Sequence, residues 1–244
     1  MIVAGMMRCK NEARWIKRSI ESIAPLCNAG IVVLDDHSTD GTAEIACGMI
    51  ATITLPSPFP GLDEARDKNF LLDVTLKTNP DWIICIDGDE ELRSYDLINL
   101  AAAMQSSKAL CLSLPVWYLW DREDQMRVDG VYGNFHRESV FRPRPGARFH
   151  EGTAPNFHCG NVPPMLRDRR EIVNAPLLHY GYMERDDRLR KYSWYNAKDP
   201  DNRSEDCYSH VVQGDLPEFP ASAKLKHAGP IEFRSTADLL RGLA

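Results

Sequence analysis

Residues 82–91 carry the stretch WIICIDGDEE, in which a run of apolar residues ends in four carboxylates within five positions. A short continuous apolar run of this kind is typical of a buried strand in a parallel sheet. Gly88 lets the backbone turn tightly enough for Asp87 and Asp89 to face one site. The stretch therefore predicts a central strand with an acidic site at its carboxyl end.

The charge of this stretch has two interpretations. Neighbouring carboxylates resist ionising together, and a bound divalent cation would offset that cost. Hard Mg²⁺ or Mn²⁺ suits such a site because these ions prefer oxygen ligands together with substrate phosphates. The alternative is a solvated turn before a helix N-terminus, where the helix dipole favours Asp and Glu. The stretch alone does not choose between them.

Two earlier segments also pass from an apolar run into polar residues. The segment IVVLDDHSTDGT ends its apolar run in Asp35 and Asp36, and the segment MRCKNE leads from another run into Asn11 and Glu12. Side chains such as Asn11 can simply cap the next helix, which is the structural alternative. In open α/β sheets, however, ligands bind outside the carboxyl ends of the strands. Three strand ends of this type therefore predict one ligand-binding edge.

Apolar runs and segments with helical spacing alternate through the first half of the chain, a pattern typical of βαβ units. After residue 119 the pattern weakens and Pro-rich punctuation increases. The expected strands are 2–7, 30–34, 50–55, 82–86, 109–117 and 175–180, and the expected helices are 12–24, 42–47, 63–77, 95–105, 185–195 and 236–243.

Composition indicates an ordinary folded α/β protein. The chain has 244 residues, 43% of them hydrophobic, and a net charge of −6, which disfavours a disordered chain. No apolar run approaches the roughly 18 residues that span a bilayer, and the N-terminus resembles a first strand more than a signal peptide. Seven cysteines without a CxxC pair favour a reducing compartment. We expect a cytoplasmic protein that contacts the inner membrane only peripherally, if at all.

The distribution of charge bears on the ligand. The acidic total argues against a dedicated nucleic-acid binder, because phosphate contacts need clustered cations. Residues 137–191, by contrast, hold eleven Lys and Arg against seven Asp and Glu. A basic segment on an acidic chain predicts one anionic ligand held in one place.

The order of these segments resembles the family 2 glycosyltransferases of the GT-A fold. The resemblance covers residues 2–92 and continues more weakly to about residue 195. It implies a GT-A type, Rossmann-like mixed sheet flanked by helices, with an irregular C-terminal region that faces the acceptor. The implied domain is 1–197, divided into a nucleotide-binding half, 1–92, and an acceptor and metal half, 93–197, with an extension at 198–244. The pairs Phe141-Arg142, His150-Glu151 and His179-Tyr180 resemble the subgroup of lipopolysaccharide-core glucosyltransferases.

The resemblance also implies a role for particular side chains. A carboxylate would bind the base, a second would hold the ribose and a third would bind the metal, while cations would contact the diphosphate. Two helix cations compete for the diphosphate role, and two further histidines compete for the metal role. The implied base pocket is Asp36 with Asn11 and Glu12, and the ribose ligand is Asp87. The diphosphate ligands are either Arg66 or Lys68, together with Arg142, which is preferred over Arg137, Arg144 and Arg148. The metal ligands are Asp89 and His179, with His150 and His158 as rivals, and the general base is Glu151.

The implied reaction is the transfer of a sugar from a nucleotide-sugar, with UDP-sugars favoured, to a hydroxyl of a glycan or other acceptor. It is hexosyltransferase-like, inverting and dependent on Mn²⁺ or Mg²⁺. Lipid-linked sugar, polysaccharide, protein and modified DNA all stay open as acceptors. A nucleotidyltransferase is one alternative, although MRCKNEAR lacks the Gly-rich loop expected after its first strand. A protein that binds nucleotide-sugars or glycans without turnover is the other.

Overall fold

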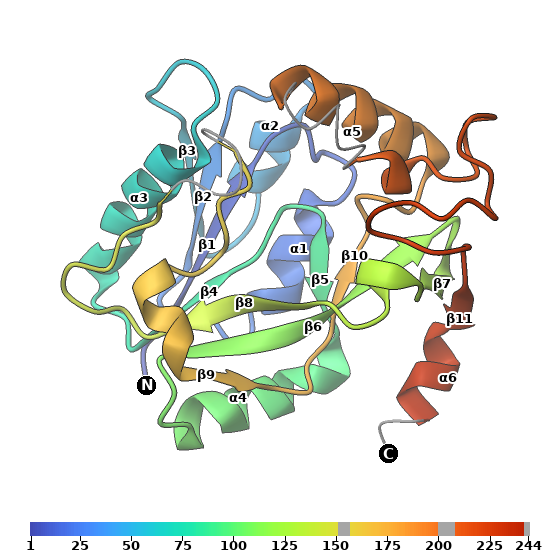
Figure 1. Cartoon of the computed structure of the whole chain (residues 1–244). Helices are drawn as coiled ribbons and strands as arrows, with labels where there is room; N and C mark the ends of the chain where they lie inside the picture. Colours follow the sequence, from blue (N-terminus) through green and yellow to red (C-terminus); the bar gives the residue numbers. More distant parts are fainter. Residues whose placement is uncertain (151–156, 200–207, 242–244) are drawn as a thin grey trace. The chain divides into compact units, whose positions relative to one another are not determined.

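The computed structural model describes residues 1–150, 157–199 and 208–241. The chain divides into two compact units, whose helices and strands are labelled in Figure 1. Unit 1 comprises Met1–Pro115 and His136–Leu177, and unit 2 comprises Val116–Phe135 and Leu178–Ala244. This division differs from the expected boundary at residue 197, because residues 178–197 belong to the same unit as the segment that follows them.

Unit 1 is built on a mixed sheet with the strand order β9-β6-β8-β4-β1-β2-β3. The first four strands of the chain run parallel to one another, β8 returns antiparallel between β4 and β6, and β9 pairs parallel to β6. The strands are β1 (Val3–Cys9), β2 (Ile31–Asp35), β3 (Thr52–Pro56), β4 (Trp82–Cys85), β6 (Cys111–Trp120), β8 (His136–Phe141) and β9 (Arg170–Ile172).

Helices cover both faces of this sheet. Helix α1 (Ile16–Ile23) and helix α4 (Leu97–Ser106) pack on the face that includes Met7 and Val33. Helix α3 (Glu64–Thr75) packs on the opposite face. Alternate residues of a strand point to opposite faces, so the inner parallel strands β1, β2 and β4 are buried on both sides and are largely apolar. The remaining elements of the unit are α2 (Thr42–Cys47), β5 (Glu90–Leu92) and the short 3-10 helices Leu76–Thr78, Ser94–Asp96 and Pro164–Arg169.

Unit 2 contains the distal half of β6, paired with β7 (Arg122–Arg127), which in turn pairs with β11 (Phe233–Ser235). The guanidinium groups of Arg127 and Arg188 both lie over the ring of Trp120, at 4.8 and 4.5 Å from its centroid. Arg127 pairs with Asp129 at 2.7 Å and Arg188 with Asp215 at 2.6 Å. Helices α5 (Arg185–Lys198) and α6 (Thr236–Arg241), strand β10 (Leu177–His179), which begins in unit 1, and the 3-10 helices Gly130–Tyr132 and Ser209–Val211 complete the elements.

The expected strands and helices of the first half are confirmed, as are helices α4 and α5. Strands β5, β7, β8, β9 and β11 were not expected. β7 has the sequence REDQMR, and β8 begins with His, Arg and Glu, so neither shows the apolar run of a buried strand. Within the described ranges no helix is long and apolar enough to cross a bilayer.

Candidate functional site

The carboxyl ends of β1, β2 and β4 form one edge of the sheet in unit 1. Cys9 pairs with Asp35 in the parallel register, and the N–H of Asp36 donates to the Cys9 carbonyl at 2.9 Å. A Cβ added at Gly88 would lie 3.2 Å from Cys9 Cβ and 3.3 Å from Glu12 Cβ. The turn after β4 therefore packs directly on the segment after β1, which explains the glycine at this position. The structure thus brings the three polar strand ends together.

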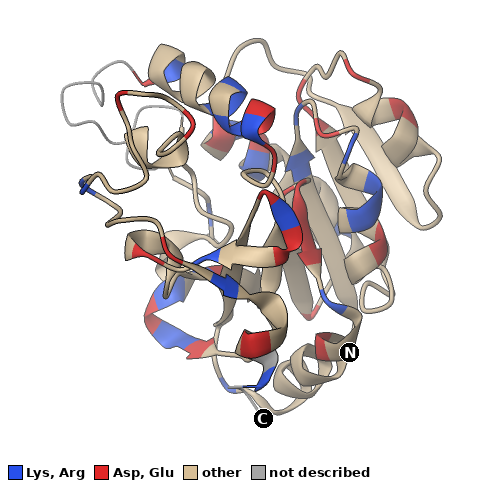
Figure 2. Ribbon diagram, turned by 90° about the vertical axis from the view of Figure 1, so that its right-hand side faces the viewer, with Lys and Arg blue, Asp and Glu red and all other residues tan. Residues whose placement is uncertain are grey.

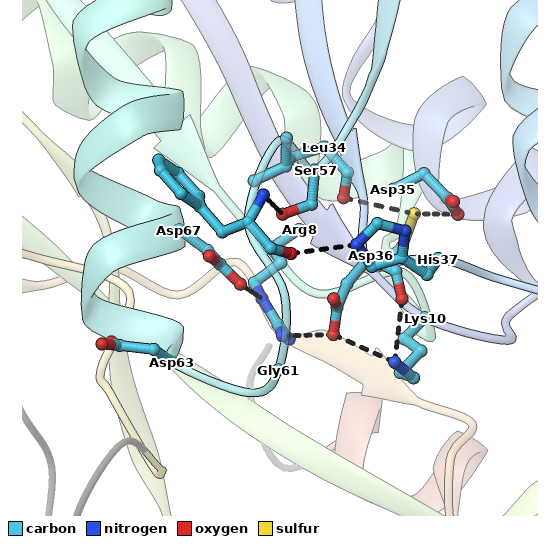
Figure 3. A network of polar contacts seen from close by, with 12 residues as sticks. Arg8, Lys10, Leu34, Asp35, Asp36, His37, Ser57, Gly61, Asp63 and Asp67 are labelled. Atoms are coloured by element: carbon cyan, nitrogen blue, oxygen red, sulfur yellow. Dashed lines mark hydrogen bonds and ion pairs between the residues drawn. The ribbon is translucent and has the colours of Figure 1, made fainter.

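Asp36 is the centre of a buried ionic network at this edge (Figure 3). Its Oδ2 accepts from Arg8 Nη2 at 2.7 Å and from Lys10 Nζ at 3.3 Å. Arg8 Nε also donates to Asp67 Oδ2 at 3.1 Å, and Arg66 pairs with the other oxygen of Asp67 at 2.9 Å. Asp36 and Asp67 are 2% and 0% exposed. The network fixes the Asp36 carboxylate, and sequence reasoning missed Arg8, Lys10 and Asp67 because ion pairs between distant positions leave no local pattern.

Asn11 and Glu12 join the first loop of this edge to the second. Their backbone N–H groups donate to Ser38 Oγ at 2.9 Å and to Thr42 Oγ1 at 2.8 Å. Asn11 Oδ1 also accepts the N–H of Thr39 at 2.9 Å. Asn11 has a φ of 55°, a left-handed conformation that Asn adopts more readily than most residues. These contacts shape the loops on which Asp36 stands.

The carboxylates after β4 have a protein cation of their own. Arg137 Nη1 lies 2.7 Å from Asp87 Oδ2, and Arg137 also forms an ion pair with Glu90, which is fully buried. The other carboxylate oxygen of Glu90, Oε2, accepts the N–H of Asp87 at 3.0 Å. Arg137 reaches this edge because β8 runs antiparallel to β4 and begins beside its carboxyl end. Part of the positive charge that the sequence argument assigned to a metal therefore comes from an arginine.

Arg142 does not lie at this edge. Because Phe141 pairs with Ile83, Arg142 follows β8 at the amino end of β4. Its guanidinium stacks 4.0 Å above the ring of Trp82 and donates to the carbonyl of Ser107 at 3.1 Å. Five residues of extended chain separate positions 82 and 87, or about 16 Å. The structure therefore places Arg137, not Arg142, beside Asp87.

The two candidate cations of α3 both have acceptors within unit 1. Lys68 Nζ donates to the carbonyls of Cys159 at 2.7 Å and Gly160 at 3.2 Å, and to Asn161 Oδ1 at 2.7 Å. Arg66 donates to the carbonyl of Gly61 at 2.9 Å and keeps 30% of its side chain exposed. Arg66 is thus the more accessible of the two.

The expected metal ligands and general base are spread over several parts of the chain. Asp89 is 4% exposed in unit 1, whereas His179 is 8% exposed in unit 2 and packs 4.9 Å from the ring of Tyr118. His150 and His158 are exposed. Glu151 lies outside the described residues. In the part of the chain that the structure describes, no three His, Cys, Asp or Glu residues form a metal-binding group.

The donor set at Asp89 nevertheless suits a hard cation. Mg²⁺ and Mn²⁺ take oxygen ligands, and Mg²⁺ commonly uses only one or two carboxylates, completing its shell with water and substrate phosphates. A buried carboxylate beside two others that already share an arginine offers such a ligand. The residues present therefore fit a metal that binds together with a diphosphate.

Three arginines of the basic segment 137–191 pair with separate carboxylates. Arg148 pairs with Asp73 at 2.8 Å and Arg170 with Glu138 at 3.0 Å, in addition to the pairs of Arg137. Basic and acidic residues are interspersed along the ribbon (Figure 2). Much of the local positive charge is therefore paired with separate carboxylates.

Glu64, at the start of α3, is a further ionisable group near this edge. Its Oε2 accepts the N–H of Cys159 at 2.9 Å. Burial raises the pKa of Glu64 above its ordinary value of 4.5, although the charges of Lys68 and Arg8 oppose that shift. Because the folded-state pKa is raised, the contribution of this carboxyl to stability is fully present below pH 4.5 and is lost as the pH rises through the folded-state value.

Glu64→Gln keeps an acceptor for the Cys159 N–H and removes the charge. We expect the variant to have a higher Tm than the wild type at neutral pH, with the difference shrinking as the solution is acidified. Thermal unfolding of both proteins between about pH 4 and pH 8 measures this. A variant that loses stability at neutral pH would instead show that the ionised carboxylate is needed there.

Comparison with known families agrees with this geometry. Residues 6–162 match the family described as Glycosyl transferase family 2, which is well over half of the chain. The chain belongs to glycosyl transferase family 2. The match includes the three polar strand ends and Arg137, so the whole edge described above lies within the family domain.

Relatives and solved structures extend the comparison. An uncharacterised protein of Mycobacterium tuberculosis is 26% identical over 83% of this chain and 52% of its own length. An uncharacterised glycosyltransferase of Rickettsia bellii is 27% identical over 55% of this chain and 45% of its own. The chain thus spans about half the length of these curated relatives.

Structures of Staphylococcus aureus TarS, residues 1–349, match this family 2 chain with a TM-score of 0.53 and 12% identity. One covers 93% of this chain and 76% of TarS; another, in complex with UDP-GlcNAc, covers 87% and 72%. The expected GT-A type of mixed α/β fold is confirmed.

Proposed function

We propose that this family 2 chain transfers a sugar from a nucleotide-sugar donor to a hydroxyl acceptor. The observation that carries the proposal is the convergence of Asp36, Asp87 and Asp89 at the carboxyl ends of β1, β2 and β4. This is the edge at which open α/β sheets bind nucleotides. One carboxylate for each of the base, the ribose and the metal accounts for three acidic side chains, at the ends of β2 and β4, that a fold without a ligand would not need.

The base would be read by Asp36. Arg8 and Lys10 both donate to its Oδ2, and these contacts fix the orientation of the carboxylate and therefore of Oδ1. A carboxylate accepts hydrogen bonds and donates none, so it suits a base that presents a donor: the ring N–H of uracil, thymine or guanine, or the amino group of cytosine or adenine. The TarS complex with UDP-GlcNAc favours uracil among these. We therefore propose a UDP-sugar, with Asn11 and Glu12 shaping the base pocket.

The remaining residues would contact the ribose, the diphosphate and the metal. Asp87 would accept from the ribose hydroxyls, and Arg66 would contact the diphosphate. Asp89, together with a histidine, would hold Mn²⁺ or Mg²⁺; His179 is proposed for that place, with His150 and His158 as the alternatives. The metal, when bound, would offset the negative charge of the departing diphosphate.

The acceptor side is proposed from chemistry alone. Inverting transfer needs a carboxylate to take the proton of the attacking hydroxyl, and Glu151 is the proposed group. A glycan is the proposed acceptor class.

Buried thiols such as Cys27, whose pKa burial raises to about 12, are compatible with a reducing cytoplasm.

A thermal-shift panel of UDP-, GDP-, CMP- and dTDP-sugars, each with and without Mn²⁺, tests the donor. A ligand that binds only the folded state raises its Tm, so we expect the largest rise with a UDP-sugar and Mn²⁺ and none with a CMP-sugar.

Asp36→Asn removes a charge-assisted hydrogen bond worth about 1.5–3 kcal/mol, which corresponds to roughly 10- to 100-fold weaker binding.

Two results would count against the proposal. If no donor raises the Tm, the chain has no nucleotide-sugar site. Tight binding with neither hydrolysis nor transfer over a broad acceptor panel would instead indicate a binding protein without turnover. A CMP-sugar bound as well as a UDP-sugar would contradict the proposed preference for UDP-sugars.

A further inference from the structure

The carboxylate of Asp87 is held from two sides. Arg137 contacts Oδ2 at 2.7 Å from strand β8, and Asn161 Nδ2 lies 3.4 Å from Oδ1. Asn161 is itself 2% exposed, and its Oδ1 accepts from Lys68 Nζ at 2.7 Å. A chain of contacts therefore leads from helix α3, through Lys68 and Asn161, to Asp87.

The ammonium group of Lys68 uses all of its donors in this arrangement. It has three N–H donors, and three oxygens of residues 159–161 receive them at 2.7 to 3.2 Å. The side chain is 5% exposed. To contact a diphosphate, Lys68 would have to leave these oxygens without their donor in a buried place, which is costly.

The charges of Lys68 and Asp87 also act on the same neighbours. Burial raises the pKa of the Cys85 thiol to about 12, the charge of Lys68 opposes that rise, and the charge of Asp87 adds to it. The same two charges act in opposite directions on Glu64. Lys68 and Asp87 thus lie close enough to interact electrostatically with a shared set of groups.

We propose that Lys68 is a positioning residue that acts through Asn161 to fix the carboxylate of Asp87, and that it does not contact the diphosphate. This inference rests on the proposed function, in which Asp87 accepts from the ribose. A carboxylate already held in one rotamer loses less side-chain entropy when the ligand arrives. Lys68 would therefore strengthen the binding of the nucleoside part of the donor.

Asn69 supplies a matched control on the same helix. Its Nδ2 donates to the carbonyl of Phe149 at 2.9 Å, and its Oδ1 accepts the N–H of Phe149 at 2.9 Å. Asn69 thus also joins α3 to a distant segment, but its contacts do not lead to Asp87. A role that is merely structural predicts the same behaviour for Lys68 and Asn69.

The first test compares UDP with uridine, which has no phosphate. We expect Lys68→Met and Asn161→Ala to weaken both ligands by the same factor, roughly 3- to 30-fold, and Asn69→Ala to weaken neither. Titration calorimetry for UDP and competition by uridine measure the two affinities. Weakening of UDP alone would show a direct phosphate contact and overturn the proposal, as would wild-type affinity in Lys68→Met.

The second test needs no ligand. In a double-mutant cycle followed by urea unfolding, Lys68→Met and Asp87→Asn should lose less stability together than the sum of their separate losses, because both break the same chain of contacts. Asn69→Ala and Asp87→Asn should be additive. An additive result for Lys68 would overturn the inference, whether or not the wild type binds UDP. Failure of the wild type to bind UDP would instead count against the proposed donor alone.

Discussion

Asp89→Asn is expected to lower the rate of sugar transfer by about a thousandfold. A divalent cation that offsets the charge of a leaving diphosphate contributes several kcal/mol to the transition state, and ~4 kcal/mol corresponds to that factor. Asp89 is the carboxylate proposed to hold such an ion, because it lies in the turn after β4 and is only 4% exposed. The amide of Asn has the same shape but lacks the charge that the ion needs.

The measurement separates metal binding from turnover. UDP is titrated into both proteins with and without Mn²⁺, and transfer or donor hydrolysis is followed in parallel. We expect the Mn²⁺-dependent gain in UDP affinity to disappear in Asp89→Asn. Glu91→Gln is the control, because Glu91 lies in the same acidic stretch, in β5, and pairs with Arg18 at 3.6 Å with both side chains partly exposed. Undiminished turnover in Asp89→Asn would end the proposed metal role.

The sequence was sufficient to predict that the polar ends of neighbouring strands share one edge of the sheet. Buried parallel strands are apolar on both faces, so runs such as 31–34 and 82–86 mark them without reference to their partners. The carboxyl ends of neighbouring parallel strands share an edge, so Asp36 and Asp87 could be assigned to one place. The structure confirms those strands and their parallel pairing.

Which cations stand at that edge could not be predicted in the same way. Strand β8 is half polar, HRESVF, and its antiparallel pairing decides whether Arg137 or Arg142 lies beside Asp87. The acceptors of Lys68 are backbone and amide oxygens 91 to 93 positions away. Backbone carbonyls carry no sequence signal, so no local pattern could distinguish a lysine that binds phosphate from one that holds a loop.

The acidic cluster after β4 predicted a cation but did not identify it. Four carboxylates in five residues do require a compensating positive charge, but that requirement does not identify its source. The structure supplies Arg137 for Asp87 and Glu90. A cluster of acidic residues at a strand end therefore predicts a cation, while the choice between a metal and an arginine depends on what a distant strand brings to the same edge.

Arg137→Met should accordingly be the most destabilising of these substitutions, at about 3–5 kcal/mol of the free energy of unfolding. Methionine preserves most of the apolar stem but leaves Glu90, which is fully buried, and Asp87 without their cation. Removing one partner of a buried pair costs more than the pair contributes, because an uncompensated charge stays behind. Urea unfolding of the two proteins measures the loss.

Arg148→Met is the matched control for this prediction. It is the same substitution in the same segment, and Arg148 pairs with Asp73 at a similar distance of 2.8 Å, but both side chains are about half exposed. Such a surface pair contributes at most about 1 kcal/mol. Mn²⁺ should restore part of the Tm lost in Arg137→Met and none of that lost in Arg148→Met, since an added cation can replace the arginine only where carboxylates converge. Equal losses in the two variants would mean that the Arg137 cation does not hold this edge together.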